Sequence, residues 1–99
     1  MSSTKPGAER AWNVSVAKSA QKQLDKLPAR DFARVDAAIG GMRDDPFSGD
    51  VVHLTNAETA YRRRVGDYRI LFDVFGDRRH VDVVAVLRRT TTTYRKRRK

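Results

Sequence analysis

Residues 61–72 read YRRRVGDYRILF, and this segment decides the fold of the chain. Two strand-like runs, rich in aromatic, β-branched and basic residues, flank the dipeptide Gly66-Asp67. A Gly-Asp pair between two such runs is typical of a two-residue hairpin loop. The sequence therefore predicts an antiparallel hairpin with strands at residues 61–65 and 68–75.

The hairpin also predicts which side chains share a face of the sheet. A two-residue loop places Val65 opposite Tyr68 and Arg64 opposite Arg69. Since side chains alternate along each strand, one face is expected to be mainly apolar. That face would hold Tyr61, Val65, Tyr68, Ile70 and Phe72. The other face would hold Arg62, Arg64, Arg69 and Leu71.

Two helical patterns precede the hairpin. Residues 12–16 alternate as a short strand, and from Ala17 to Leu27 apolar residues recur at the spacing of one helical face until Pro28. A second amphipathic pattern follows, with apolar positions at Phe32, Val35, Ile39 and Met42. We expect an antiparallel helix pair that covers a sheet.

The rest of the chain completes a small α+β domain. Residues 51–54 allow a short further strand, residues 76–79 make a turn, and residues 80–87 form the most apolar strand. The expected order is β-α-α-β-β-β, with two N-terminal helices packed on a mainly antiparallel twisted sheet. The expected organisation is a flexible leader at residues 1–11, one domain at residues 12–95 and a basic tail at residues 96–99.

The charge of the chain points to a polyanionic partner. Its 99 residues include 21 Lys and Arg against 12 Asp and Glu, a formal net charge of +9. Nucleic acid is the first candidate, and a merely solubilising charged surface is the alternative. The absence of cysteine excludes disulfides and thiolate metal sites, and no apolar run has the length of a membrane span. We expect a cytoplasmic protein with no membrane partner, metal or cofactor.

The arginine pair across the hairpin favours a function over a purely structural role. Like charges directly opposite one another destabilise a sheet, and an anionic ligand would remove that penalty. The alternative is a solvated charged face whose arginines pair with acids such as Asp73. A second basic cluster, Arg88-Arg89 with the later Tyr94, leaves the neighbouring strand and supports the functional interpretation.

These motifs together resemble the RelE/ParE toxin superfamily over residues 12–95. The likeness is carried by residues 61–70, by the preceding pattern Ala20-x-x-x-Leu24-x-x-Leu27-Pro28, and by the Val-rich strand that ends in Arg88-Arg89 and Tyr94. The resemblance implies a toxin of a type II toxin–antitoxin pair. It implies that the chain binds a cognate antitoxin and, on the ribosome, cleaves messenger RNA in the A site without a metal.

The resemblance also implies roles for single residues. Arg62 and Arg64 match the basic pair of the RNA-cleaving members, and Arg69 matches their phosphate-binding arginine. Arg88 or Arg89 matches a later arginine at the leaving group, and Tyr94 matches the aromatic residue that orients the substrate base. Arg89 and Arg95 complete the expected RNA-binding set.

One departure from the family changes the expected chemistry. RelE-like ribonucleases often have lysines where this chain has Arg62 and Arg64, and a guanidinium with a pKa above about 12 is a poor general base. The arginines are therefore expected to stabilise charge, and Tyr94 is the better proton carrier. Both histidines, His53 and His80, are interpreted as ordinary residues because neither has the spacing of a metal site or a catalytic triad.

Two other functions stay open at this level. Members of the ParE branch share the fold but inhibit DNA gyrase, and they generally lack the full basic and aromatic set. A degenerate toxin that only binds RNA is the third reading, supported by the missing lysines.

Overall fold

The computed structural model describes residues 11–55 and 59–88. This part contains five strands, two α-helices and one 3-10 turn. In chain order they are β1 (Asn13–Val16), α2 (Lys18–Asp25), α3 (Ala29–Gly41), β2 (Asp50–His53), β3 (Tyr61–Val65), β4 (Tyr68–Phe75), η1 (Gly76–Arg78) and β5 (His80–Arg88). The predicted α+β class and element order are confirmed, with β2 as the further short strand. Residues 1–10 of the predicted leader and the whole predicted tail lie outside the described residues.

The five strands form one sheet in the order β1-β5-β4-β3-β2. Three neighbouring pairs are antiparallel, and β1 pairs with β5 in parallel. The sequence did not predict this parallel pair, which joins the first and last strands of the described chain. The two edge strands, β1 and β2, have only four residues each, a length that limits pairing with foreign strands.

The β3–β4 hairpin has the predicted register. Val65 pairs with Tyr68 and Arg64 with Arg69, so Gly66 and Asp67 form the two-residue loop. Gly66 has a φ of 57°, a conformation that glycine adopts without the steric cost of a side chain. Positive φ at the first loop position alone is the pattern of a type II′ turn, whose twist matches that of the flanking strands.

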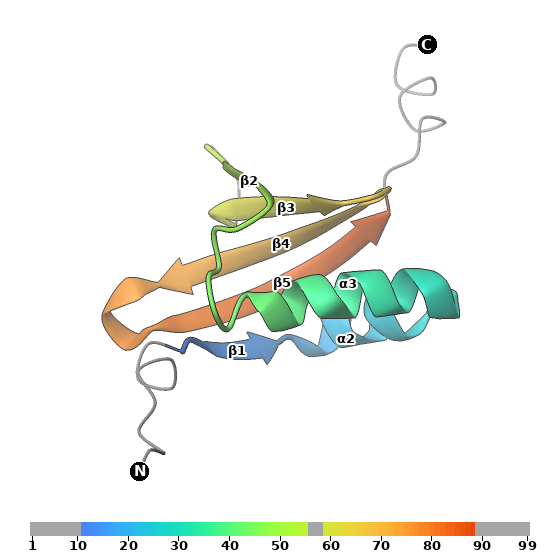
Figure 1. Ribbon diagram of the computed structural model, residues 1–99, viewed down its shortest axis with the longest axis horizontal. Coiled ribbons are helices and arrows are strands. Elements are labelled where there is room, and N and C mark those ends of the chain that lie inside the picture. The colour runs from blue at the N-terminus through green and yellow to red at the C-terminus, as the bar shows by residue number, and fades with distance from the viewer. Residues whose placement is uncertain (1–10, 56–58, 89–99) are drawn as a thin grey trace.

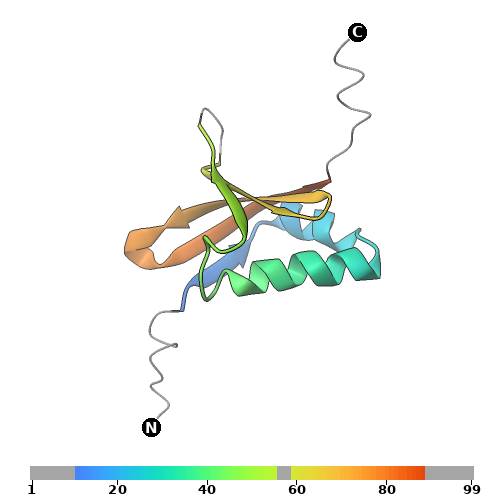
Figure 2. The same ribbon diagram turned by 45° about the horizontal axis from the view of Figure 1, so that its top comes forward.

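The helices form an antiparallel pair on one side of the sheet (Figures 1 and 2). Each buries a stripe of apolar residues, Ala20 and Leu24 from α2 and Val35, Ala38 and Ile39 from α3. Pro28 stands between them as the N-cap residue of α3. Its fixed φ and missing N–H suit the start of a helix and end the preceding one. No helix in the described ranges is long and apolar enough to cross a membrane.

The core lies between the helices and the face of the sheet that the sequence predicted to be apolar. Ile70 and Phe72 of β4 and Val81 and Val83 of β5 have no exposed surface. Tyr61 and Val65 of β3 pack against this core as half-buried residues. The helices therefore cover one face of β3 and β4, and the side chains between these core positions point to the other face.

Candidate functional site

Three arginines lie on the face of the sheet opposite the helices. Arg62 and Arg64 come from β3 and Arg69 from β4, each one position away from a core residue. The register places Arg62 opposite Leu71 and Arg64 opposite Arg69. We call these three residues the arginine cluster and their side of the sheet the arginine face. The structure thus brings together Arg62, Arg64 and Arg69 as the hairpin register predicted.

Within the arginine cluster, Arg64 forms a long ion pair. Arg64 Nε lies 4.0 Å from Asp50 Oδ2 on β2, and both side chains are about half exposed. An ion pair of this length and exposure contributes little to stability. Asp73, the acid weighed as a partner for the arginines, instead accepts a hydrogen bond from the Ala60 N–H at 2.7 Å.

Arg62 has a donor suited to an anion. Its Nη1 atom is buried and has no hydrogen-bond partner in the described part of the chain. A buried guanidinium nitrogen without an acceptor is costly, because it has lost its water without gaining a protein partner. Because this nitrogen has no accessible surface, a phosphate oxygen on the arginine face would reach it only after a rearrangement of the Arg62 side chain.

Arg63 belongs to the other side of β3. It pairs with the buried Ile70, and its guanidinium lies against Gly49 so closely that a Cβ there would be 2.8 Å from Arg63 Cζ. Its neighbours therefore make Arg63 part of the packing beside the core. This placement agrees with its omission from the predicted site.

Arg88 does not join the arginine cluster. It ends β5 opposite Tyr68, on the helix side of the sheet. There the Tyr68 hydroxyl donates a 2.8 Å hydrogen bond to Asp31 Oδ2 of α3. This bond, burial and the charge of Asp31 raise the pKa of Tyr68 above its ordinary 10.0, while Arg88 acts in the opposite direction. The other predicted site residues, Arg89, Tyr94 and Arg95, lie outside the described residues.

The structure also forms a pocket that the sequence did not predict. It lies at the far end of the arginine face, where β4 turns into β5, and Asn13 and Ser15 of β1 contribute to it. The sequence did not indicate this pocket because the pocket depends on the parallel pairing of β1 with β5. That pairing sets Asn13 beside His80 and Ser15 beside Asp82. The one feature of the sequence that pointed to a polar site here is the alternation of Asn13 and Ser15 with the apolar residues of that strand.

The two histidines occupy different places. His80 lines the pocket at the end of the arginine face. His53 is exposed and contacts the Tyr61 ring edge to face, with 5.1 Å between ring centroids. Among residues 11–55 and 59–88, no group of three or more His, Asp or Glu side chains is arranged to hold a metal ion.

Comparisons with known proteins identify relatives of this chain. The family model of the ParE toxin of the type II toxin–antitoxin system parDE matches residues 14–92. A chain of the RelBE2 toxin–antitoxin complex from Mycobacterium tuberculosis is 27% identical, with a TM-score of 0.69, over 80% of this chain and 99% of that one.

Two archaeal complexes are similar as well. A chain of the RelE–RelB complex from Pyrococcus horikoshii OT3 is 23% identical with a TM-score of 0.71, over 82% of this chain and 98% of that one. A chain of the RelB–RelE complex from Methanococcus jannaschii is 26% identical with a TM-score of 0.63, over 82% and 95%. No curated protein sequence matches the chain.

Proposed function

Because the chain belongs to the ParE toxin family of type II toxin–antitoxin systems, we propose that it is a ribonuclease toxin that cleaves messenger RNA in the ribosomal A site. The observation that supports this proposal is the arginine cluster, in which the hairpin register places Arg62, Arg64 and Arg69 on the face of the sheet opposite the helices. Three guanidinium groups on one sheet face supply the positive charge and the hydrogen-bond donors that phosphate groups bind.

The proposed reaction needs no metal and no covalent enzyme intermediate. The ribose 2′-oxygen attacks the adjacent phosphorus, and the bond from phosphorus to the 5′-oxygen breaks. Arg62, Arg64 and Arg69 stabilise the extra negative charge of the phosphorane, because preorganised donors bind it more strongly than the ground-state phosphate. A guanidinium is too weak an acid or base to carry the protons, so we assign proton transfer to Tyr94.

The leaving-group role falls to Arg89 before Arg88 in this proposal. Arg88 lies opposite Tyr68 on the helix side of the sheet, away from the arginine cluster. We therefore expect Arg89→Ala to lower the cleavage rate more than Arg88→Ala does. The opposite order of effects would return the role to Arg88.

We propose that a cognate antitoxin holds the toxin inactive. Solved structures that are similar to this chain include toxin–antitoxin complexes. An acidic or amphipathic antitoxin segment laid over the arginine face would neutralise Arg62, Arg64 and Arg69 and exclude RNA from them. Mixing the toxin with its antitoxin should then protect the three arginines from guanidine-modifying reagents.

The test is a map of messenger RNA 5′ ends after brief induction of the toxin in cells that lack its antitoxin. Codon-phased cuts in translated messages are expected, and they should vanish in Arg69→Ala.

The match to a ParE family model favours gyrase inhibition as the second candidate. Growth arrest with intact messages and DNA damage would establish that candidate, and intact messages without arrest would indicate a degenerate toxin.

A further inference from the structure

The pocket at the far end of the arginine face has an unusual mixture of chemical groups. It has a volume of about 500 Å³ and is lined by Asn13, Ser15, Phe75, Arg78, His80 and Asp82. This volume falls within the roughly 300–1,000 Å³ of small-molecule sites. The lining combines an amide, a hydroxyl, an imidazole, a guanidinium, a carboxylate and one phenyl ring.

The hydrogen bonds in the pocket argue against a hydrolytic triad. Ser15 Oγ donates to Asp82 Oδ1 at 3.2 Å and lies 2.9 Å from His80 Nε2. The direction of the contact between Ser15 and His80 depends on the tautomer of the imidazole. In a catalytic triad the carboxylate orients the histidine, whereas here the Asp82 carboxylate contacts the serine. The three side chains instead present hydrogen-bond donors and acceptors along one side of the pocket.

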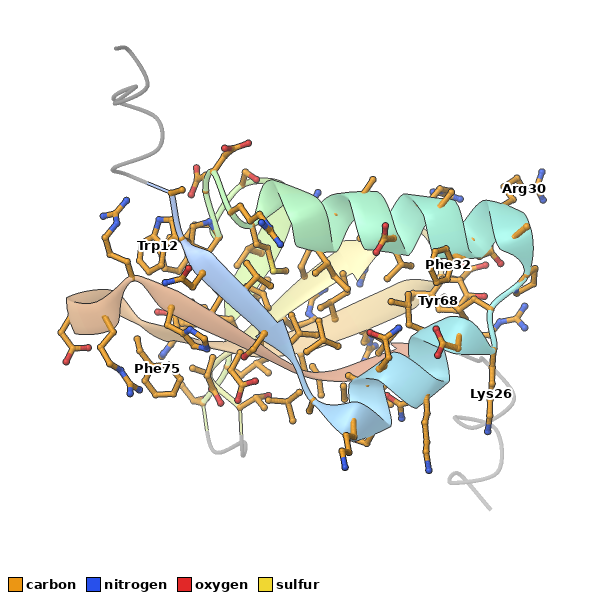
Figure 3. All side chains as sticks on the ribbon, turned by 90° about the horizontal axis from the view of Figure 1, so that it is seen from below. Trp12, Lys26, Arg30, Phe32, Tyr68 and Phe75 are labelled. Atoms are coloured by element: carbon orange, nitrogen blue, oxygen red, sulfur yellow. The ribbon has the colours of Figure 1, made fainter. Side chains whose placement is uncertain are left out.

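Phe75 gives the pocket an aromatic platform. Phe75 is 37% exposed, and Figure 3 shows it on the side of the sheet opposite Trp12. The Arg78 guanidinium lies 4.9 Å from the centre of the ring, and the His80 ring centroid lies 6.3 Å away. Unpaired RNA bases stack on aromatic rings and on arginine planes of this kind.

We propose that this pocket binds one unpaired base of the same RNA strand whose phosphates contact the arginine cluster. The proposal rests on the proposed function. A base edge carries both donors and acceptors, which suits the Asp82 carboxylate and the Asn13 amide together, whereas Asp82 would repel a simple anion. Phe75 and Arg69 are six residues apart on one face of β4, roughly 20 Å at 3.3 Å per residue, so the base belongs to a nucleotide a few positions from the scissile phosphate.

The experiment measures binding of short single-stranded RNAs to the purified chain by fluorescence anisotropy. Phe75→Ala should weaken binding roughly 5- to 150-fold, as loss of one stacked base does. Phe47→Ala is the matched control, because Phe47 is 46% exposed but packs on Tyr61 outside the pocket.

A series of RNAs that each lack one base identifies the nucleotide in the pocket. The critical abasic RNA should bind the parent as weakly as the intact RNA binds Phe75→Ala, and combining both changes should cause no further loss.

A photo-crosslink locates the base directly. With 4-thiouridine at the critical position, the crosslinked peptide should lie within residues 73–82. Crosslinks elsewhere, or equal binding by Phe75→Ala and the parent while Arg69→Gln binds weakly, would overturn the pocket proposal and leave the proposed function standing. A parent chain without affinity for RNA either alone or on the ribosome would overturn both.

Discussion

Arg64 of β3 lies directly opposite Arg69 of β4, on the face of the sheet away from the helices. Directly opposed like charges destabilise a β-sheet by up to about 1 kcal/mol. The partner that the structure defines for Arg64, Asp50, is 4.0 Å away and half exposed, so it recovers little of this energy. In the proposed function a bound polyanion offsets this repulsion, so substitution of Arg64 tests the proposal.

Arg64→Gln should remove toxicity without removing stability. The substitution relieves the repulsion with Arg69 and loses only a weak contact, so the free energy of unfolding should stay within about 1 kcal/mol of the parent. Urea denaturation measures this energy, and growth after induction measures toxicity. Lys22→Gln, on the exposed side of α2, is the control that should stay toxic. A large loss of stability in Arg64→Gln would mean that Arg64 supports the fold.

The salt dependence of RNA binding should report the number of phosphate contacts. Each phosphate neutralised on a single strand contributes about 0.7 to the slope of log K against log salt concentration. Arg62→Gln should therefore weaken binding and lower the slope by about 0.7, because it removes one such contact. Arg30→Gln, on the exposed start of α3, should change neither quantity. An unchanged slope in Arg62→Gln would exclude Arg62 from phosphate binding.

Gly66→Ala should destabilise the hairpin. Gly66 has a φ of 57°, and a Cβ there would lie 2.9 Å from Arg34 Nη2. The backbone conformation alone costs roughly 1–2 kcal/mol for a residue with a side chain. Gly76→Ala is the matched control, since a Cβ at Gly76 meets no atom within 4 Å. Thermal unfolding of both variants compares the two sites, and equal midpoints would contradict the expected strain of a side chain at Gly66.

Tyr68→Phe should change how stability depends on pH. The hydrogen bond to Asp31 and burial raise the pKa of Tyr68 above 10.0 in the folded chain. Above pH 10.0 the unfolded tyrosine loses its proton first, so the stabilisation from Tyr68 is complete below that pH and is lost as the pH rises through the folded pKa. Urea unfolding at neutral pH and above pH 10.0 should show a smaller decline for Tyr68→Phe. Parallel declines would show that Tyr68 ionises equally in both states.

The hairpin is the part of the structure that the sequence predicted most fully. Gly66-Asp67 defines a loop of two residues, and a loop of known length fixes the strand register arithmetically. The register then assigned Arg62, Arg64 and Arg69 to one face and Ile70 and Phe72 to the core, as the structure has them. The helices were predictable for a similar reason, because a 3.6-residue period is a local property of the chain.

The sequence by itself determined the elements, the hairpin register and the composition of the arginine face, because each depends on residues close together in the chain. Tertiary structure alone decided that β1 pairs in parallel with β5, whose paired residues lie 67 positions away in the chain. That pairing brings Asn13 and Ser15 to His80 and Asp82 and creates the pocket. The tertiary structure also decided that Arg88 lies beside Tyr68 on the helix side of the sheet. A register shift between Leu71 and Phe72 changes which side chains of β5 share a face with those of β4. Local periodicity carries no information about a partner strand so distant, or about an irregularity in the pairing with it.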